Sequence, residues 1–347
     1  MASRGSLRKM RAMNSCLVFA LIASSAIALN PSDPKNPQEA VARLQQAVSR
    51  TNIFELPSFV MKAKVQIELK GKMVDGTYQL LWNGEDQWRE EILLPEYAEI
   101  QVGGKGMLWV KRNTNFIPLR IYNIHEALGF GSGVAGAGAL HTGSLVRLSL
   151  PPDVKVKKTH GRTIHGEALT CTEIADEQES SSEVCVSDRS GTLVRGTTYL
   201  DKDLQPAGTK LFPRSLSFLD NGTTVASVVV TDFETPVQIP AEVFKAPEGA
   251  QGSPGCMNPE PFQLLKRRTP EYPESARRLR TQGIVAIDVS IGSDGVPRIG
   301  KVVESPSPDL AQSSLRAFRD WRYRPARCGD QPVDVETILE TRYSLSH

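Results

Sequence analysis

The sequence of 347 residues lacks the short motifs that mark common catalytic sites. It has no Gly-x-Ser-x-Gly nucleophile turn, no His-Glu-x-x-His metal site and no paired-carboxylate motif. The five histidines are scattered, and only His160 and His165 lie near each other. We interpret these two as part of an exposed turn, with a metal pair as the alternative. The sequence therefore predicts no enzyme activity, no cofactor and no metal centre.

Long apolar runs and a strong excess of charge are also missing. After residue 29, no segment is long and apolar enough to span a membrane. Four of the 41 basic residues lie in the first eleven positions. Without them the chain has 37 basic and 39 acidic residues, a net charge of −2. Bulk charge therefore gives no reason to expect nucleic acid or an anionic membrane as a partner. The arginines near the C-terminus are interleaved with acids, which favours a solvated helix face over a nucleic-acid site.

Residues 1–28 are typical of a secretory signal peptide. Four basic residues precede an apolar run from Cys16 to Leu29, and Ala26-Ile27-Ala28 supplies small residues at the spacing of a cleavage site. The run is shorter than the roughly 20 apolar residues of a spanning helix. An uncleaved inner-membrane anchor is the alternative. We expect the chain to be exported to the periplasm.

Apart from Cys16, the cysteines are Cys171, Cys185, Cys256 and Cys328. An even number of cysteines in an exported chain predicts disulfides. The first two flank a polar turn region, so they would face each other across a hairpin. The other two would then pair and tie the entry of a C-terminal domain to the segment before its last strand. The alternatives are four free thiols or a metal site, although no C-x-x-C or Cys/His cluster supports a metal.

Alternating apolar and polar residues, separated by Gly, Asn-Gly and Asp-Gly turns, dominate residues 31–235. After a helix at 38–50, this pattern predicts one large antiparallel sheet with few helices. The predicted strands are 59–69, 76–82, 87–93, 97–102, 107–110, 168–174, 183–186, 193–200, 214–219 and 223–230. Residues 129–143 form a Gly-rich loop without the Gly-Lys-Ser/Thr of a phosphate loop. Residues 236–261, rich in proline and glycine, are predicted to be a linker.

Residues 262–347 form the predicted C-terminal domain. Pro273 can begin a short helix, because its missing N–H would be unpaired there, and Ala276 and Leu279 would face inward. An alternating strand, a Gly-Ser-Asp-Gly turn and a returning strand follow over residues 285–303.

A second helix is predicted to start at Ser307-Pro308-Asp309, which supplies an N-cap hydroxyl, a proline and an acid in the first turn. Its inner face would carry Leu310, Ala317, Phe318 and Trp321. A last alternating strand would run over residues 333–343, at the edge of a small antiparallel sheet with both helices on one face.

This order of elements resembles the C-terminal domain of TonB over residues 266–344. Four motifs carry the resemblance, and they occur in the family's order: Tyr272-Pro273, Gly283-Ile-Val285, Asp294-Gly-Val-Pro297 and Trp321-Arg-Tyr-Arg-Pro325. The resemblance implies a non-catalytic periplasmic protein whose last strand pairs with a short segment of an outer-membrane receptor. The partner-binding residues would be Thr269, Tyr272, Asp334, Val335, Glu336, Thr337, Ile338, Leu339, Glu340, Thr341, Arg342 and Tyr343. An edge covered by another domain or by a second copy is the alternative.

Residues 31–250 more weakly resemble the LolA/LolB-like carriers, in which an opening helix precedes many antiparallel strands. That family holds lipid or lipoprotein acyl chains in an apolar concavity. The expected fold class is α+β, with a β domain that has a LolA-like half-barrel as one form and a small TonB-like two-layer α/β sandwich after it. The residues that would line a ligand cavity are Trp82, Trp88, Trp109, Phe116 and Tyr122. A plain core role for them is the alternative.

Three functions fit these observations. The preferred one is an envelope protein of the TonB family that binds an outer-membrane partner by strand addition, with energised transport across the outer membrane left open. A periplasmic carrier of lipid or lipoprotein, or a scaffold, in which the TonB-like domain is structural, is the second. The third is a membrane-anchored transducer, which requires an uncleaved N-terminus.

Overall fold

The computed structural model describes residues 36–69, 71–128, 154–175, 181–194, 199–220, 222–257 and 259–345. The predicted signal peptide and the Gly-rich loop lie outside these residues. All described residues belong to one compact unit. In this part of the chain, no helix combines the length and the apolar character that a bilayer crossing requires.

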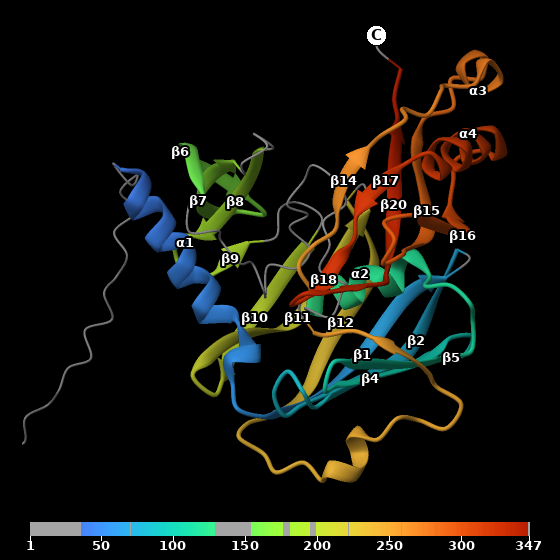
Figure 1. Cartoon of the computed structure of the whole chain (residues 1–347). Coiled ribbons are helices and arrows are strands. Elements are labelled where there is room, and N and C mark those ends of the chain that lie inside the picture. The colour runs from blue at the N-terminus through green and yellow to red at the C-terminus, as the bar shows by residue number, and fades with distance from the viewer. Residues whose placement is uncertain are drawn as a thin grey trace, which may run out of the picture. The chain divides into compact units, whose positions relative to one another are not determined.

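The largest sheet of the described residues has nine antiparallel strands, in the order β10-β11-β12-β1-β2-β3-β4-β5-β13 (Figure 1). Its strands are β1 (Phe59–Leu69), β2 (Lys72–Trp82), β3 (Trp88–Leu93), β4 (Ala98–Gly104), β5 (Met107–Arg112), β10 (Tyr199–Ala207), β11 (Lys210–Asp220), β12 (Thr223–Glu234) and β13 (Gln251–Pro254). The alternation in β1 shows why these segments form strands. Met61 and Ala63 are buried, whereas Lys62 and Lys64 are exposed, so one face packs and the other meets water.

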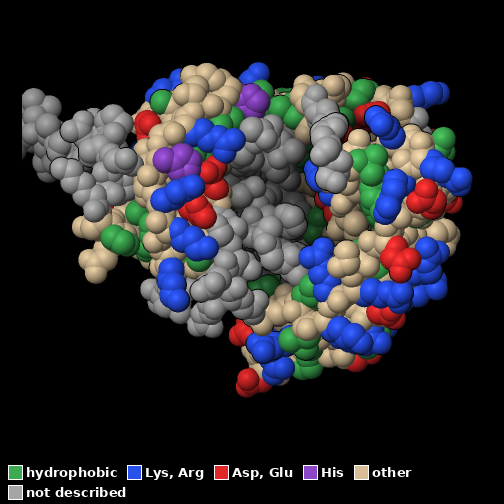
Figure 2. All heavy atoms as spheres, turned by 90° about the horizontal axis from the view of Figure 1, so that it is seen from above, with side chains coloured by type: hydrophobic (Ala, Val, Ile, Leu, Met, Phe, Trp, Pro, Cys, Tyr) green, Lys and Arg blue, Asp and Glu red, His purple; other side chains and the backbone are tan. Residues whose placement is uncertain are grey.

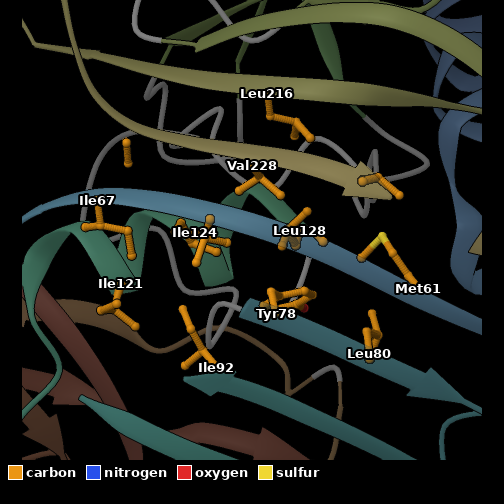
Figure 3. Packing of buried hydrophobic residues seen from close by; sticks show 14 of the residues in the cluster. Met61, Ile67, Tyr78, Leu80, Ile92, Ile121, Ile124, Leu128, Leu216 and Val228 are labelled. Atoms are coloured by element: carbon orange, nitrogen blue, oxygen red, sulfur yellow. The ribbon is translucent and has the colours of Figure 1, made fainter. Parts of the chain in front are cut away.

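The buried face of this sheet packs on helix α2 (Leu119–Leu128), which the sequence pattern did not predict. Figure 3 shows Ile121, Ile124 and Leu128 of α2 pointing toward strand residues such as Ile67 and Tyr78. These side chains are at most 1% exposed. The short 3-10 turn η1 (Ile53–Glu55) adds Ile53 to the same core.

A separate four-stranded sheet lies after the Gly-rich loop, so the prediction of one sheet is wrong. Its order is β6-β7-β8-β9, with β6 (Lys155–Ile164), β7 (Glu167–Ala175), β8 (Ser181–Ser187) and β9 (Leu193–Val194). Helix α1 (Pro37–Thr51) packs on it through Leu44 and Ala47. Cys171 and Cys185 are register partners in β7 and β8 and form the predicted disulfide.

Residues 236–261, predicted to be a linker, contain secondary structure, and one strand of this segment belongs to the nine-stranded sheet. It contains the 3-10 turn η3 (Ala241–Phe244) and strand β13, which pairs with β5. The second predicted disulfide, Cys256–Cys328, is also present and joins residues 72 positions apart.

The C-terminal residues form a three-stranded antiparallel sheet, β16-β15-β20, with two helices. The elements are α3 (Glu274–Arg278), β15 (Gly283–Ile291), β16 (Pro297–Glu304), α4 (Pro308–Arg319) and β20 (Val335–Tyr343). Two ribbons accompany them: β14 (Gln263–Lys266) with β17 (Arg322–Arg324), and β18 (Ala326–Cys328) with β19 (Gln331–Val333). The predicted inner residues of α4 are buried, and Ser307 Oγ accepts a hydrogen bond from Leu310 N at 3.3 Å. The inward placement of Leu279 is wrong, because α3 ends one residue earlier and leaves this side chain 79% exposed.

Candidate functional site

Strand β20 has one hydrogen-bonded neighbour. It pairs with β15 from Gly283–Tyr343 to Ile291–Val335 without a register shift. In the sheet order of the described residues, its other margin has no strand partner. An unpaired margin exposes backbone N–H and C=O groups, which an extended segment of another chain can satisfy. β20 is therefore an edge strand of its sheet, as β16 is on the opposite side.

One face of β20 is fixed by the helices. Its residues Val335, Leu339 and Tyr343 belong to the C-terminal core. The Tyr343 hydroxyl lies 2.9 Å from Ser314 Oγ, and its ring meets that of Tyr272 edge-on, with centroids 5.4 Å apart. Packing on this side fixes one face of the strand against the helices.

The two predicted partner residues that precede α3 have different surroundings. The Tyr272 hydroxyl donates a hydrogen bond to Thr281 O at 2.6 Å, so Tyr272 supports Tyr343 from a half-buried position. Thr269 is exposed. The structure thus connects Tyr272 to β20 through the core and does not bring Thr269 into that contact.

The other face of the sheet is met by the end of β5 and the start of α2. Leu119 packs against Ala286 of β15 and Ile338 of β20 in a small apolar cluster. The guanidinium of Arg112 donates from its two terminal nitrogens to Glu336, Nη1 to Oε1 at 2.9 Å and Nη2 to Oε2 at 3.1 Å. The first half of the polar face that alternation predicts for β20, with Glu336, is thus an internal contact.

Tyr122 of α2 marks where the free margin of β20 begins. Its hydroxyl lies 3.1 Å from Thr337 Oγ1. Thr337 lies between Glu336 and Ile338, whose side chains meet the covering segment, so its own side chain points to the helix side. We infer that the phenol reaches around the unpaired margin at this position. Past this contact, Glu340 and Arg342 are exposed.

A buried chain of charges holds this contact together. Arg112 Nε donates to Glu99 Oε2 at 2.8 Å while its other nitrogens bind Glu336, and the side chains of Arg112 and Glu99 are 9% and 1% exposed. Burial opposes ionisation of Glu99, but the charges of His125 and Arg112 outweigh it and lower its pKa below the usual value. The Tyr97 hydroxyl also donates to Glu99.

His125 continues the chain of charges into the core of the nine-stranded sheet. Its Nδ1 lies 2.8 Å from Glu90 Oε1 and its Nε2 lies 3.8 Å from Glu99 Oε1. Burial disfavours the charged ring, but the two carboxylates prevail and raise the pKa of His125 to about 9. The imidazole is therefore charged at neutral pH.

Asp288 of β15 lies at the other end of the network. Its Oδ1 accepts a hydrogen bond from Ile117 N at 3.5 Å. Burial and the nearby charge of Glu336 raise the pKa of Asp288 to about 7. Gly300 of β16 leaves space for this carboxyl, because a Cβ there would collide with it. Sequence reasoning missed the network, because its members lie far apart in the chain and match no motif.

The five predicted cavity residues do not gather around one space. Trp82 and Trp88 are 2% and 4% exposed and belong to the core of the nine-stranded sheet. Phe116 lies under Lys301, with Nζ 3.8 Å from the ring centroid. A pocket of about 490 Å³ lies elsewhere, and none of the five lines it; its apolar lining includes Ile164, Leu193, Leu204 and Phe212.

The histidine pair does not form a metal site with described residues. His160 lies in β6, so the predicted turn is wrong there, and His165 lies in the turn that follows. Among the described ranges, the one close grouping of potential ligands is His160, Cys171 and Glu183. The sulfur of Cys171 is held in a disulfide, so no thiolate is available to a metal.

Comparison with known families identifies the C-terminal residues. The family described as "Gram-negative bacterial TonB protein C-terminal" matches residues 268–345. The match covers the helices and strands that build the β20 margin and confirms the predicted resemblance. A comparison with curated proteins gives no match.

Solved structures similar to the chain include three bacterial proteins. A LolA superfamily protein from Nitrosomonas europaea is 16% identical, covers 59% of this chain and 97% of its own, and has a TM-score of 0.35. A DUF1329 family protein from Desulfovibrio piger is 9% identical, covers 62% of this chain and 98% of its own, and has a TM-score of 0.38. A putative outer membrane lipoprotein-sorting protein domain from Vibrio parahaemolyticus is 11% identical, covers 60% of this chain and 97% of its own, and has a TM-score of 0.35. One of these similar structures is of the LolA superfamily, which residues 31–250 were predicted to resemble.

Proposed function

We propose that the chain is a non-catalytic protein of the Gram-negative envelope that binds an outer-membrane protein by accepting a strand on the free margin of β20. The observation that carries this proposal is the single neighbour of β20 in its sheet. The family match supports the kind of partner, because it covers the residues that form this margin. Main-chain hydrogen bonds would supply affinity, and the side chains beside the margin would select the partner.

The surroundings of β20 favour one part of the margin. Tyr122 and Arg112 stand beside Thr337 and Glu336, at the start of the strand. A partner strand would therefore align with residues 339–343, beyond these two contacts. Glu340 and Arg342 lie within residues 339–343 and carry one charge of each sign, which favours a partner segment of mixed charge.

The alternative function, carriage of lipid or lipoprotein, has less support. A carrier requires an apolar space that the ligand can enter. The buried face of the nine-stranded sheet is occupied by Ile121, Ile124 and Leu128 of α2, none of which is measurably exposed.

Hydrogen–deuterium exchange with synthetic peptides from the N-terminal plug segments of outer-membrane receptors tests the proposal. We expect a binding peptide to slow exchange of the outward-facing amides in residues 339–343. β16 is an internal control, because it forms the opposite margin of the same sheet. The same peptide with a central proline is a second control, because proline has no N–H to donate. Protection at β16 alone, or at neither strand, would show that β20 does not accept a strand.

A further inference from the structure

The surface of the C-terminal ribbons carries a local charge that the whole chain does not show. Residues 266–324 contain twelve lysines and arginines against seven acids, a net charge of +5, whereas the rest of the chain has 29 basic and 32 acidic residues. Figure 2 shows Lys and Arg side chains, in blue, on the side of the molecule that carries the C-terminal elements of Figure 1. The neutral total therefore conceals a basic region.

Pairing of β14 with β17 concentrates these cations on one face. Tyr323 of β17 turns into the core, so Arg322 and Arg324 point outward. Lys266 is the register partner of Arg322. Arg267 lies over the ring of Trp321, 5.6 Å from its centroid. Arg319 at the end of α4 is exposed beside them, and its carbonyl accepts a hydrogen bond from Arg322. We call these five residues with Leu265 the basic ribbon.

Acids do not neutralise the basic ribbon. Asp320 is the nearest acid in the sequence, and it is bound by Arg268 at 2.6 Å. The pKa of Asp320 is lowered by Arg268 and by the positive charges of Lys266 and Arg322, which shows the local potential. In the described part of the chain, none of the five cations of the ribbon lies within ion-pair distance of a carboxylate.

An apolar side chain projects from the middle of this charged face. The register of β14 with β17 shifts between Leu264 and Lys266, and Leu265 stands out at this irregularity, 64% exposed. A bulge of this kind redirects a side chain. Exposed cations around a protruding leucine suit the surface of an anionic bilayer, where phosphates take the cations and the leucine enters the boundary with the acyl chains.

Nucleic acid fits this face poorly. Proteins that bind single strands present aromatic rings for the bases to stack on. Here Trp321 and Tyr323 are 5% and 3% exposed, so the rings are inside and the cations are outside. We propose that the basic ribbon is a docking surface for an anionic lipid bilayer, independent of the strand margin of β20.

The test uses the full chain with vesicles of phosphatidylglycerol and phosphatidylethanolamine, and with vesicles of phosphatidylcholine. Amide exchange in β14 and β17 is the readout, because the basic N-terminal stretch has its own cations and would confuse a pelleting assay. We expect the anionic vesicles to slow exchange in these strands more than tenfold, and this protection to fade as salt rises. Phosphatidylcholine vesicles should leave exchange unchanged.

Two matched variants decide whether the ribbon is responsible. Removing three ribbon cations (Lys266→Gln, Arg322→Gln, Arg324→Gln) should weaken vesicle binding at this face by roughly a hundredfold, at roughly fivefold per cation. The control removes three exposed lysines of β1 and β2 (Lys62→Gln, Lys64→Gln, Lys72→Gln) and should bind as the wild type does. Equal protection in both variants, or protection by polyglutamate but not by anionic vesicles, would overturn the assignment.

Discussion

Arg112 is the residue on which the contact between β20 and the nine-stranded sheet depends. It is the cation between Glu99 and Glu336, and both pairs lie within 3 Å. Because Arg112 and Glu99 are almost fully buried, loss of the guanidinium would leave the Glu99 carboxylate in a low-dielectric site with only His125, 3.8 Å away, to compensate its charge.

Replacement of this arginine should therefore be costly. We expect Arg112→Met to lower the free energy of unfolding by about 3 to 5 kcal/mol, measured by urea denaturation. Arg298→Met is the control, because Arg298 pairs with Asp294 at 3.1 Å with both side chains 54% exposed. That variant should lose less than about 1 kcal/mol. Equal losses in the two variants would mean that the buried network adds nothing specific.

Asp288 should make the stability depend on pH. Its raised pKa, about 7, means that the folded chain holds a proton where the unfolded chain, with a pKa near 3.8, has lost it. The contribution to the free energy of unfolding is therefore fully present below pH 3.8 and is lost as the pH rises toward 7. The slope for one proton is at most about 1.4 kcal/mol per pH unit.

Denaturation of Asp288→Asn at several pH values isolates this contribution, because asparagine imitates the protonated carboxyl. The stability of the wild type minus that of the variant should fall from about pH 4.5 through pH 7 and become constant about one pH unit above that. A difference that is constant throughout, or that rises with pH, would show that Asp288 is ionised in the folded chain.

At the scale of the elements, alternation identified most of the strands, because one face of each strand is buried and the other is polar. It missed α2 for a physical reason. The inward face of this ten-residue helix carries His125, whose charge is compensated by Glu90 and Glu99 from β3 and β4. A polar residue on the inner face interrupts the regular spacing of apolar residues that indicates a helix. The partners of that residue cannot be identified before the fold is known.

The same limit applies to the site. Alternation in the last strand correctly separated the core face from the polar face, but it cannot tell whether the polar face meets water or another part of the chain. Glu336 alternates as a solvent residue would, yet it binds Arg112, 224 positions away. The predicted edge position of the last strand agrees with the sheet order β16-β15-β20, an order that alternation within one strand does not determine.

At the scale of the whole molecule, the Cys256–Cys328 disulfide limits how far the C-terminal sheet can move from the nine-stranded sheet. Cys256 follows β13, which pairs with β5, and Cys328 ends β18. The second disulfide, Cys171–Cys185, joins two adjacent strands of the four-stranded sheet. The two crosslinks therefore have different roles: one connects distant parts of the fold, and the other reinforces a hairpin.

Removal of each disulfide should separate these roles. The double variant Cys256→Ser with Cys328→Ser opens a loop of 72 residues, and the regained entropy of the unfolded chain should lower the free energy of unfolding by roughly 4 kcal/mol. It should also weaken the contact between α2 and β20, because the crosslink no longer restrains it. We expect faster amide exchange in α2, β13 and β20 of this variant. Cys171→Ser with Cys185→Ser should cost roughly 3 kcal/mol, with faster exchange confined to β6 to β9. If both variants speed exchange in α2 and β20 equally, the tether has no separate role, and the buried charges around Arg112 alone keep the first half of β20 covered.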